Sequence, residues 1–333
     1  MKKVFLLTIA LTLFVGSGTV LAKDFPTRPI EISCFASAGG GTDTTDRAIA
    51  KAMEPYLGVT INVVNRTGGA GGVAMNAVWS KPHDGHYWGG FSESILPAPV
   101  MGGHHTSAKD WIYYMVGGAP GVISVRPDSK FKTLDQLVKA AKADPGNIKA
   151  SASAAGGIWH TKLIALMNGA GIKFNFIPFN GSHPSQVAAM TGEVEVVLTS
   201  ISEQAELVKA KKLVPLAMVE LKPYTFPGVG KIAAAVDKYP NVAKLLPLDQ
   251  WLGFALPADV PKDVVKKVDD AFAKAMKTDA IKDLAKNRNM TLYGYYGKQA
   301  QDVARKMESV WTWTLFDLGI AKKSPEGFGI PKP

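Results

Sequence analysis

The sequence predicts an α/β protein of two lobes, built from mixed, mostly parallel sheets flanked by helices. Short apolar and β-branched segments alternate with amphipathic segments of about 10–15 residues, a pattern typical of βαβ units. The length of 333 residues suits two domains of ordinary size. Hydrophobic residues make up 47% of the chain and charged residues 20%, which indicates an ordered core and excludes a disordered chain.

The first 22 residues have the pattern of a secretory signal peptide. Lys2 and Lys3 precede an apolar stretch at 4–15, and small residues lead up to Ala22, after which we expect cleavage. The stretch is shorter than the roughly 20 residues of a membrane-spanning helix. No cysteine lies at the cleavage point to carry a lipid. We therefore expect a soluble periplasmic protein whose net charge falls from +10 to +8 when the two lysines are removed.

The N-terminal part of the mature chain shows strands and helices in alternation. Apolar runs bounded by turn residues predict strands at 30–35, 59–64, 87–91, 111–116 and 122–125. Apolar residues at helical spacing follow the glycine-rich turn at 37–43 and continue to Gly58, which ends that helix. A second glycine-rich turn at 68–72 opens a helix at 73–79.

The same alternation continues to the C-terminus. Thr133 and Gln136 have the spacing of a capping box, which begins a helix that runs to Ala143. Pro184 suits the first turn of a helix that follows residue 182. Further strands are predicted at 148–152, 174–178, 195–199, 214–219 and 251–256. Further helices are predicted at 159–167, 203–210, 261–277 and 298–318.

The order of these elements predicts where the chain passes between the lobes. The regular alternation changes near 125–128 and returns near 249–251. We expect lobe I to comprise residues 23–125 and 250–333, and lobe II to comprise residues 126–249. Two crossings between the lobes would give a hinged, clamshell-like protein.

Glycine-rich turns after strands supply the most informative chemical signal. The turns at 37–43, 68–72 and 153–157 each precede a helix. Their glycines allow backbone N–H groups to approach a ligand, and the helix start adds unpaired donors and partial positive charge. Such sites prefer anions. Each turn could instead use its glycines only for a tight bend.

Two side chains near these turns have open roles. Asp43 either serves as a favourable acid at the helix start or faces the ligand, where it would repel an anion or accept an ammonium group. His160 lies one turn into the helix after 153–157 and either faces a ligand or packs in the core.

The sequence argues against several other classes of function. Its one cysteine, Cys34, excludes an intramolecular disulfide and a cysteine-cluster metal site, and its apolar strand suggests a buried thiol. The six histidines form no ligand pattern, and no acid, base and nucleophile set can be assembled. Lysines are interleaved with acids along helices, unlike a nucleic-acid-binding stripe. We expect no catalytic residue, no metal, no cofactor and no nucleic-acid partner.

Motifs along nearly the whole mature chain resemble those of the tripartite tricarboxylate transporter receptors, the Bug-type extracytoplasmic solute receptors. FPTRPI at 25–30 is similar to the family's mature N-terminus, and ASAGGGTD at 36–43 to its first glycine turn. The resemblance continues, in family order, with VNRTGGAGG at 64–72, PHDGH at 82–86, IPFNG at 177–181, MTGEVE at 190–195, and WLGF at 251–254 followed by PKDVV at 261–265.

The resemblance implies a type II periplasmic-binding-protein fold, a Venus flytrap that closes on a small organic carboxylate. It also implies a monomer that delivers its ligand to the membrane permease subunits of a secondary transporter. By resemblance, the lobe I contacts are Ala38, Gly39, Gly40, Thr42, Asp43, Ser92 and Ser94. The lobe II contacts are Ser153, Gly156, Gly157, His160, Phe179, Asn180 and Thr199.

The chain departs from the family pattern at a few positions. Thr67 replaces the usual proline, Asn180 replaces the usual lysine, and Glu93 adds a negative charge between two predicted contacts. These departures favour a ligand other than a tricarboxylate. Two alternatives stay open, namely an exported enzyme on the same scaffold, and a receptor for an ATP-driven importer or a sensor kinase.

Overall fold

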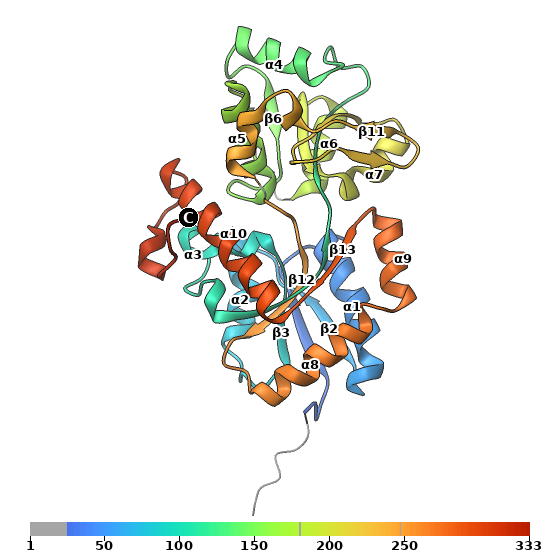
Figure 1. Cartoon of the computed structure of the whole chain (residues 1–333), viewed down its shortest axis with the longest axis vertical. Helices are drawn as coiled ribbons and strands as arrows, with labels where there is room; N and C mark the ends of the chain where they lie inside the picture. The colour runs from blue at the N-terminus through green and yellow to red at the C-terminus, as the bar shows by residue number, and fades with distance from the viewer. Residues whose placement is uncertain (1–24, 180, 247) are drawn as a thin grey trace, which may run out of the picture.

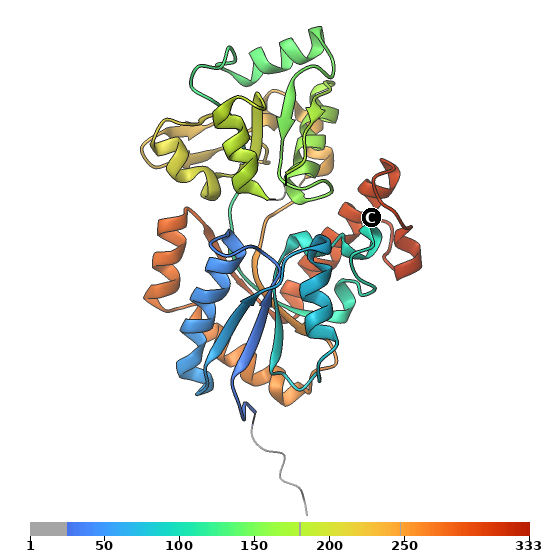
Figure 2. The same ribbon diagram turned by 180° about the vertical axis from the view of Figure 1, so that it is seen from behind.

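The computed structural model describes residues 25–179, 181–246 and 248–333, so the expected signal peptide lies outside the described residues. Two lobes, each with its own sheet, are joined by two chain crossings (Figures 1 and 2). The expected two-lobe α/β class is therefore confirmed. In the part of the chain that is described, no helix combines the length and apolar character needed to cross a bilayer.

The first lobe is built on a six-stranded sheet with the order β13-β4-β12-β3-β1-β2. Its strands are β1 (Ile30–Cys34), β2 (Ile61–Asn65), β3 (Tyr87–Ser92), β4 (Trp111–Gly118), β12 (Leu252–Pro257) and β13 (Thr291–Tyr295). Its helices are α1 (Gly41–Leu57), α2 (Gly72–Trp79), α3 (Ala98–Met101), α8 (Lys262–Ala275), α9 (Asp279–Arg288) and α10 (Gly297–Asp317). Short 3₁₀ turns lie at η1 (Gly69–Gly71), η2 (Glu93–Ile95), η3 (Ala108–Asp110) and η6 (Pro325–Phe328).

A buried aromatic stack holds the centre of the first sheet. The ring of Phe254 on β12 lies between Trp88 on β3 and Tyr114 on β4, with centroid distances of 4.6 and 4.7 Å. All three side chains are fully buried. Because they come from three neighbouring strands, their packing fixes β12, a late strand in the sequence, between two early ones.

The second lobe is built on a five-stranded sheet with the order β7-β6-β8-β5-β9. Its strands are β5 (Gly121–Val125), β6 (Lys149–Ser151), β7 (Asn175–Phe176), β8 (Val196–Ser200) and β9 (Val214–Met218), with a hairpin of β10 (Tyr224–Phe226) and β11 (Gly230–Ile232) beside them. Its helices are α4 (Leu134–Ala143), α5 (Ile158–Ala170), α6 (Ser182–Thr191) and α7 (Ile201–Lys209). Two 3₁₀ turns, η4 (Ala235–Asp237) and η5 (Pro240–Leu245), precede the return to the first lobe.

Both sheets are mixed, as expected, but parallel pairs do not predominate. β1 pairs in parallel with β2 and β3, and β6 with β7 and β8. The strands beside the crossings, β4, β5 and β12, pair antiparallel with their neighbours. The reason is topological, since a chain that leaves one lobe and later returns must run in opposite directions at the two crossings.

The first crossing lies earlier than the expected boundary at 125/126. β4 of the first sheet ends at Gly118, and β5, which belongs to the second sheet, already begins at Gly121. The run at 122–125, assigned in the expectation to lobe I, therefore pairs within lobe II. We propose a lobe boundary at residues 119–120 and keep the second one near residues 249–250.

The two crossings are packed against each other. The N–H of Ala119 donates a hydrogen bond to Oε1 of Gln250 at 3.1 Å. A Cβ at Gly118 would lie 1.8 Å from the carbonyl oxygen of Gln250, so only glycine permits this approach. The two segments thus contact each other where they meet lobe I, and Figure 1 shows both of them running between the lobes.

Candidate functional site

The first predicted glycine turn joins β1 to α1 and closes on itself. Gly39 has φ of 79°, in the left-handed region that favours glycine. Its N–H donates to Oδ2 of Asp43 at 2.9 Å, and the N–H of Gly40 donates to the carbonyl of Ser37 at 3.1 Å. The amides of the predicted contacts Gly39 and Gly40 are therefore used inside the turn.

Free amides lie slightly further along, in the first turn of α1. Within the described ranges, the N–H groups of Gly41, Thr42 and Asp43 have no hydrogen-bond acceptor. Unpaired N–H groups and the helix dipole both favour an anion at this end, next to the exposed Ala38. Gly41 is not among the residues expected from the sequence. Its position as the first helical residue after the turn is the signal that could have identified it.

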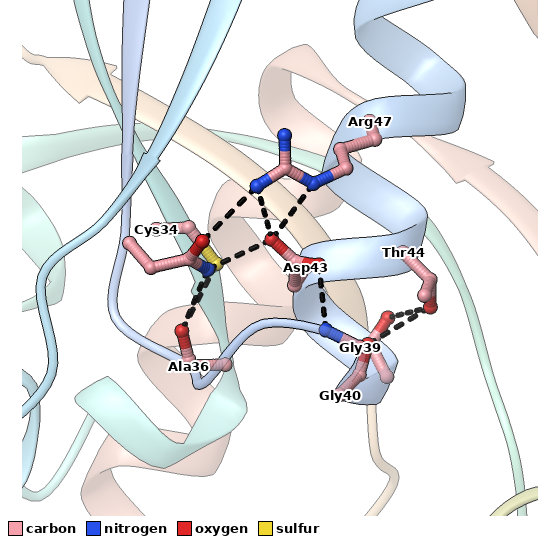
Figure 3. A network of polar contacts seen from close by, with 9 residues as sticks. Cys34, Ala36, Gly39, Gly40, Asp43, Thr44 and Arg47 are labelled. Carbon is pink, nitrogen blue, oxygen red and sulfur yellow. Dashed lines mark hydrogen bonds and ion pairs between the residues drawn. The ribbon is translucent and has the colours of Figure 1, made fainter.

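The Asp43 carboxylate points into lobe I (Figure 3). Besides Gly39, it accepts from Nδ2 of Asn65 at 2.7 Å, and it forms an ion pair with Arg47 whose Nε and Nη2 lie 3.0 and 2.9 Å away. Burial would raise the pKa of Asp43, but the hydrogen bonds from Arg47, Gly39 and Asn65 outweigh burial and hold that pKa below its usual value. This geometry matches the helix-start alternative, in which Asp43 holds the turn in place.

Cys34 lies behind this network as a buried thiol, in agreement with the expectation for its strand. Its Sγ is 3.9 Å from the carbonyl oxygen of Ala36. Burial, with the nearby Asp46 carboxyl, raises the pKa of Cys34, so the thiol stays protonated and is a poor nucleophile.

The predicted contacts Ser92 and Ser94 lie at the end of β3, next to the first turn. The parallel pairing of Cys34 with Gly90 places the carboxyl ends of β1 and β3 side by side. Oγ of Ser92 accepts the N–H of Ser94 at 3.2 Å, which caps η2. Ser92 is buried and Ser94 is half-buried, so Ser94 is the more accessible of the two hydroxyls.

The second glycine turn, at 68–72, is explained by packing. A Cβ at Gly72 would lie 2.0 Å from the carbonyl oxygen of Gly103, and one at Gly71 would lie 3.0 Å from Cγ2 of Ile95. These close approaches need small residues. The turn therefore fits the tight-bend alternative, and through Ile95 it packs against η2.

In lobe II, the turn at 153–157 leads from β6 into α5. Ser153 adopts φ of 55°, and its N–H donates to Oγ of Ser185 at 3.0 Å. The N–H of Gly157 donates to the carbonyl of Ala154 at 3.2 Å, and the N–H of Gly156 donates to Nδ1 of His160 at 3.0 Å. As in lobe I, the amides of the glycines are used to shape the turn.

His160 is a neutral donor beside this turn. Burial lowers the pKa of His160 to about 4, and its ring stacks on Phe176 at a centroid distance of 3.9 Å. Because Nδ1 accepts the N–H of Gly156, the ring proton must lie on Nε2. His160 is thus packed and also able to donate one hydrogen bond from Nε2.

The remaining predicted contacts in lobe II differ in their access. Phe179 is half-buried, and its N–H donates to the carbonyl of Ser153 at 3.1 Å, which ties it to the turn. Thr199 is fully buried, with Oγ1 accepting from Nε2 of Gln186 and of Gln204, each at 3.0 Å. Its hydroxyl therefore belongs to the interior of lobe II. Asn180 lies outside the described residues.

In both lobes, the strand ends that carry the predicted contacts lie next to a crossing. Leu252 at the start of β12 pairs with Ser92, and Gly121 at the start of β5 pairs with Ser200. The carboxyl ends of β1 and β3 therefore lie at the edge of the first sheet where the second crossing enters it. The carboxyl ends of β6 and β8 lie at the edge of the second sheet where the first crossing enters it. A Cβ at Gly156 would lie 3.1 Å from Cε of Met101, so the lobe II turn touches α3 of lobe I.

A separate cavity of about 460 Å³ lies at the hinge. It is lined by both crossings, by the segment after β9 and by β13, with Ala119, Glu220, Tyr224, Gln250 and Tyr293 among its residues. None of the predicted contacts lines it. Its walls come from both lobes, so its shape depends on the angle between them.

The model of one protein family, described as the tripartite tricarboxylate transporter family receptor, matches residues 45–312 of this chain. Among curated relatives, the protein BugT of Bordetella pertussis is 27% identical over 278 residues, which cover 80% of this chain and 81% of BugT.

Solved structures share the fold at low sequence identity. An R. palustris protein solved with adipate is 21% identical, with a TM-score of 0.75 and coverage of 90% of this chain and 99% of that chain. MatC from Rhodopseudomonas palustris with bound malate is 18% identical, with a TM-score of 0.75 and coverage of 87% and 100%. At this level of identity the likeness establishes the architecture of the two lobes.

Proposed function

The chain belongs to the tripartite tricarboxylate transporter receptor family, and from this premise we propose that it captures a small organic carboxylate between its lobes. Receptors of this family bind solutes, and we propose binding without chemical conversion. The protein would act in the periplasm as a monomer and deliver its ligand to the membrane permease subunits of a tripartite transporter. Two solved structures of the same fold hold dicarboxylates, adipate and malate, which supports this ligand class.

The observation that carries the proposal is the row of unpaired amides at the start of α1. No acceptor within the described residues satisfies the N–H groups of Gly41, Thr42 and Asp43. The half-buried Ser94 follows β3, whose carboxyl end lies beside that of β1, and Nε2 of His160 can donate from lobe II. These groups are hydrogen-bond donors, so they suit carboxylate oxygens and disfavour a cation.

Closure would bring the two sets of donors onto one ligand. The ligand stabilises the closed form only through contacts that the open form lacks. The lobes contact each other through Gly156 and Met101, through the packing of α7 on α9, and through the hydrogen bond from Oη of Tyr224 to the carbonyl of Asn289 at 3.5 Å. We propose that ligand binding shifts the angle between the lobes that these contacts hold.

The proposal is tested by thermal unfolding with a panel of malate, adipate and citrate, and with propylamine and glycerol as non-acidic controls. A ligand present at 100 times its Kd would stabilise the folded state by about 2.7 kcal/mol. We expect at least one acid, and neither control, to raise Tm. A panel in which no acid raises Tm would contradict the proposal.

A matched pair of variants tests the amides themselves. Gly41→Pro removes one N–H at the first helical position, where proline is tolerated, and the extended backbone of Gly40 (ψ of 169°) suits the residue before a proline. Gly41→Ala keeps the N–H, and its Cβ would lie 3.6 Å from Leu252, an ordinary contact. We expect only Gly41→Pro to weaken acid binding, by roughly tenfold. Equal affinity of the two variants would exclude this amide from the site.

A further inference from the structure

Glu93 links the predicted Ser92–Ser94 turn to the second crossing. Oε2 of Glu93 accepts the N–H of Trp251 at 2.9 Å, and the N–H of Glu93 donates to the carbonyl of Trp251 at 3.3 Å. Oε1 lies 3.1 Å from Oγ of Ser94. The residue is 1% exposed, so its carboxyl group forms hydrogen bonds with these neighbours and not with bulk water.

This arrangement determines where a proton on Glu93 can lie. A backbone N–H can only donate, so Oε2 must be the acceptor for Trp251. A proton on the carboxyl group therefore lies on Oε1 and points to Oγ of Ser94. In that state Ser94 accepts from Glu93, and its own hydroxyl hydrogen is free. In the ionised state the hydroxyl hydrogen of Ser94 is taken by Oε1 instead.

We propose that Glu93 is a positioning residue that makes anion binding at this turn depend on one proton. Protonated Glu93 releases the Ser94 hydroxyl to donate to a bound carboxylate. Ionised Glu93 takes that hydroxyl hydrogen and places a negative charge next to the anion, so affinity falls. This inference rests on the proposed function, since it takes Ser94 as a contact of an anionic ligand.

The surroundings favour the protonated state near neutral pH. Burial raises the pKa of Glu93 to about 8, and the negative charge of Glu203 on α7 adds to this rise. The hydrogen bonds from Trp251 and Ser94 lower the pKa but do not outweigh burial. Tyr293 on β13 also lies within electrostatic range of Glu93. Burial raises the pKa of Glu203 as well, against its hydrogen bonds with Ser200 and the positive charge of Arg288 on α9.

The test measures Kd against pH, between pH 6 and 9.5, for the acid of the malate, adipate and citrate panel that binds. For the wild type we expect Kd to increase about tenfold per pH unit above pH 8, as the loss of one proton requires. Glu93→Gln should bind with a Kd that is flat over this range, because its amide can still donate to Ser94. Glu206→Gln, an exposed change on α7, should behave as the wild type. A flat wild-type profile, or a slope that persists in Glu93→Gln, would overturn the proposal.

A second measurement needs no ligand. Carbon-13 NMR of the glutamate carboxyl groups should show one group that titrates near pH 8 in the wild type and is missing in Glu93→Gln. Absence of such a group would overturn the role of Glu93 even if an acid binds. Conversely, a panel without any binding acid would overturn the proposed function and leave the titration of Glu93 as an independent result.

Discussion

Removing the carboxylate of Asp43 tests whether this residue holds the first glycine turn or recognises the ligand. The carboxylate accepts from the N–H of Gly39, from Asn65 and from Arg47 at 2.7–3.0 Å. In Asp43→Ala the donors of Gly39 and Asn65 lose a charged acceptor inside the lobe. Arg47, whose side chain is 48% exposed, can turn to water.

The expected cost follows from these contacts. Hydrogen bonds to a charged group contribute about 1.5–3 kcal/mol each when buried, while an exposed ion pair contributes about 0.2–1 kcal/mol. The bonds to Gly39 and Asn65 together give about 3 kcal/mol, and Arg47 adds little. For a lobe of roughly 150–250 residues, a loss of about 3 kcal/mol lowers Tm by roughly 6–12 °C.

The assay combines calorimetry with the ligand panel. We expect Asp43→Ala to lose affinity equally for plain dicarboxylates and for amino acids such as aspartate, because the turn itself is disturbed. Asp270→Ala, which breaks an exposed ion pair with Lys266 on α8, is the matched control and should change Tm little. The stability difference between Asp43→Ala and the wild type should shrink in acid. The pKa of Asp43 is lowered in the folded state, so its contribution is lost as pH falls through that value.

A selective result would refute this reasoning. If Asp43→Ala kept the wild-type Tm and lost only the binding of amino acids, Asp43 would read a ligand ammonium group. The hydrogen bonds to Gly39 and Asn65 would then contribute little to the fold.

Two further predictions concern buried charges outside the turns. Lys162→Met removes the partner of Glu220, which also accepts the N–H of Gly121 next to the first crossing, and should lower stability by about 3–5 kcal/mol in chemical unfolding. Adding Glu220→Gln should recover part of this loss, and no recovery would argue against the pair. Burial raises the pKa of Glu308 from 4.5 to about 7, so wild-type stability should fall by about 3 kcal/mol as pH rises from 4.5 to 7. Glu308→Gln should lack that fall, and an unchanged profile would contradict the assignment.

Patterns local in the sequence predicted much of the fold. The capping hydroxyl of Thr133 accepts the N–H of Gln136, as its spacing predicts. The elements that were missed have weak local signals. β13 (Thr291–Tyr295) is half-exposed along its length, with an irregular register to β4, so it lacks the apolar run of a central strand. The helix at Asp279–Arg288 follows α8 after only a short turn and is mostly exposed.

The candidate site was harder to predict because its partners come from distant positions. Asn65 reaches Asp43 only because β2 pairs beside β1, and Trp251 reaches Glu93 across 158 residues of sequence. The family resemblance points to Thr199 as a contact, but side-chain amides from α6 and α7 enclose its hydroxyl. A local signal did exist for Arg47, since it lies four residues after Asp43 on one helix face.

The joined crossings have a mechanical consequence. Gly118 packs closely against the backbone of Gln250, and the N–H of Ala119 donates a hydrogen bond to the side chain of Gln250. The two linkers therefore act as a single hinge. A single hinge permits the two lobes to bend and twist about one axis, but it resists sliding of one lobe past the other. The donors of the two lobes would then meet in the same relative position at each closure.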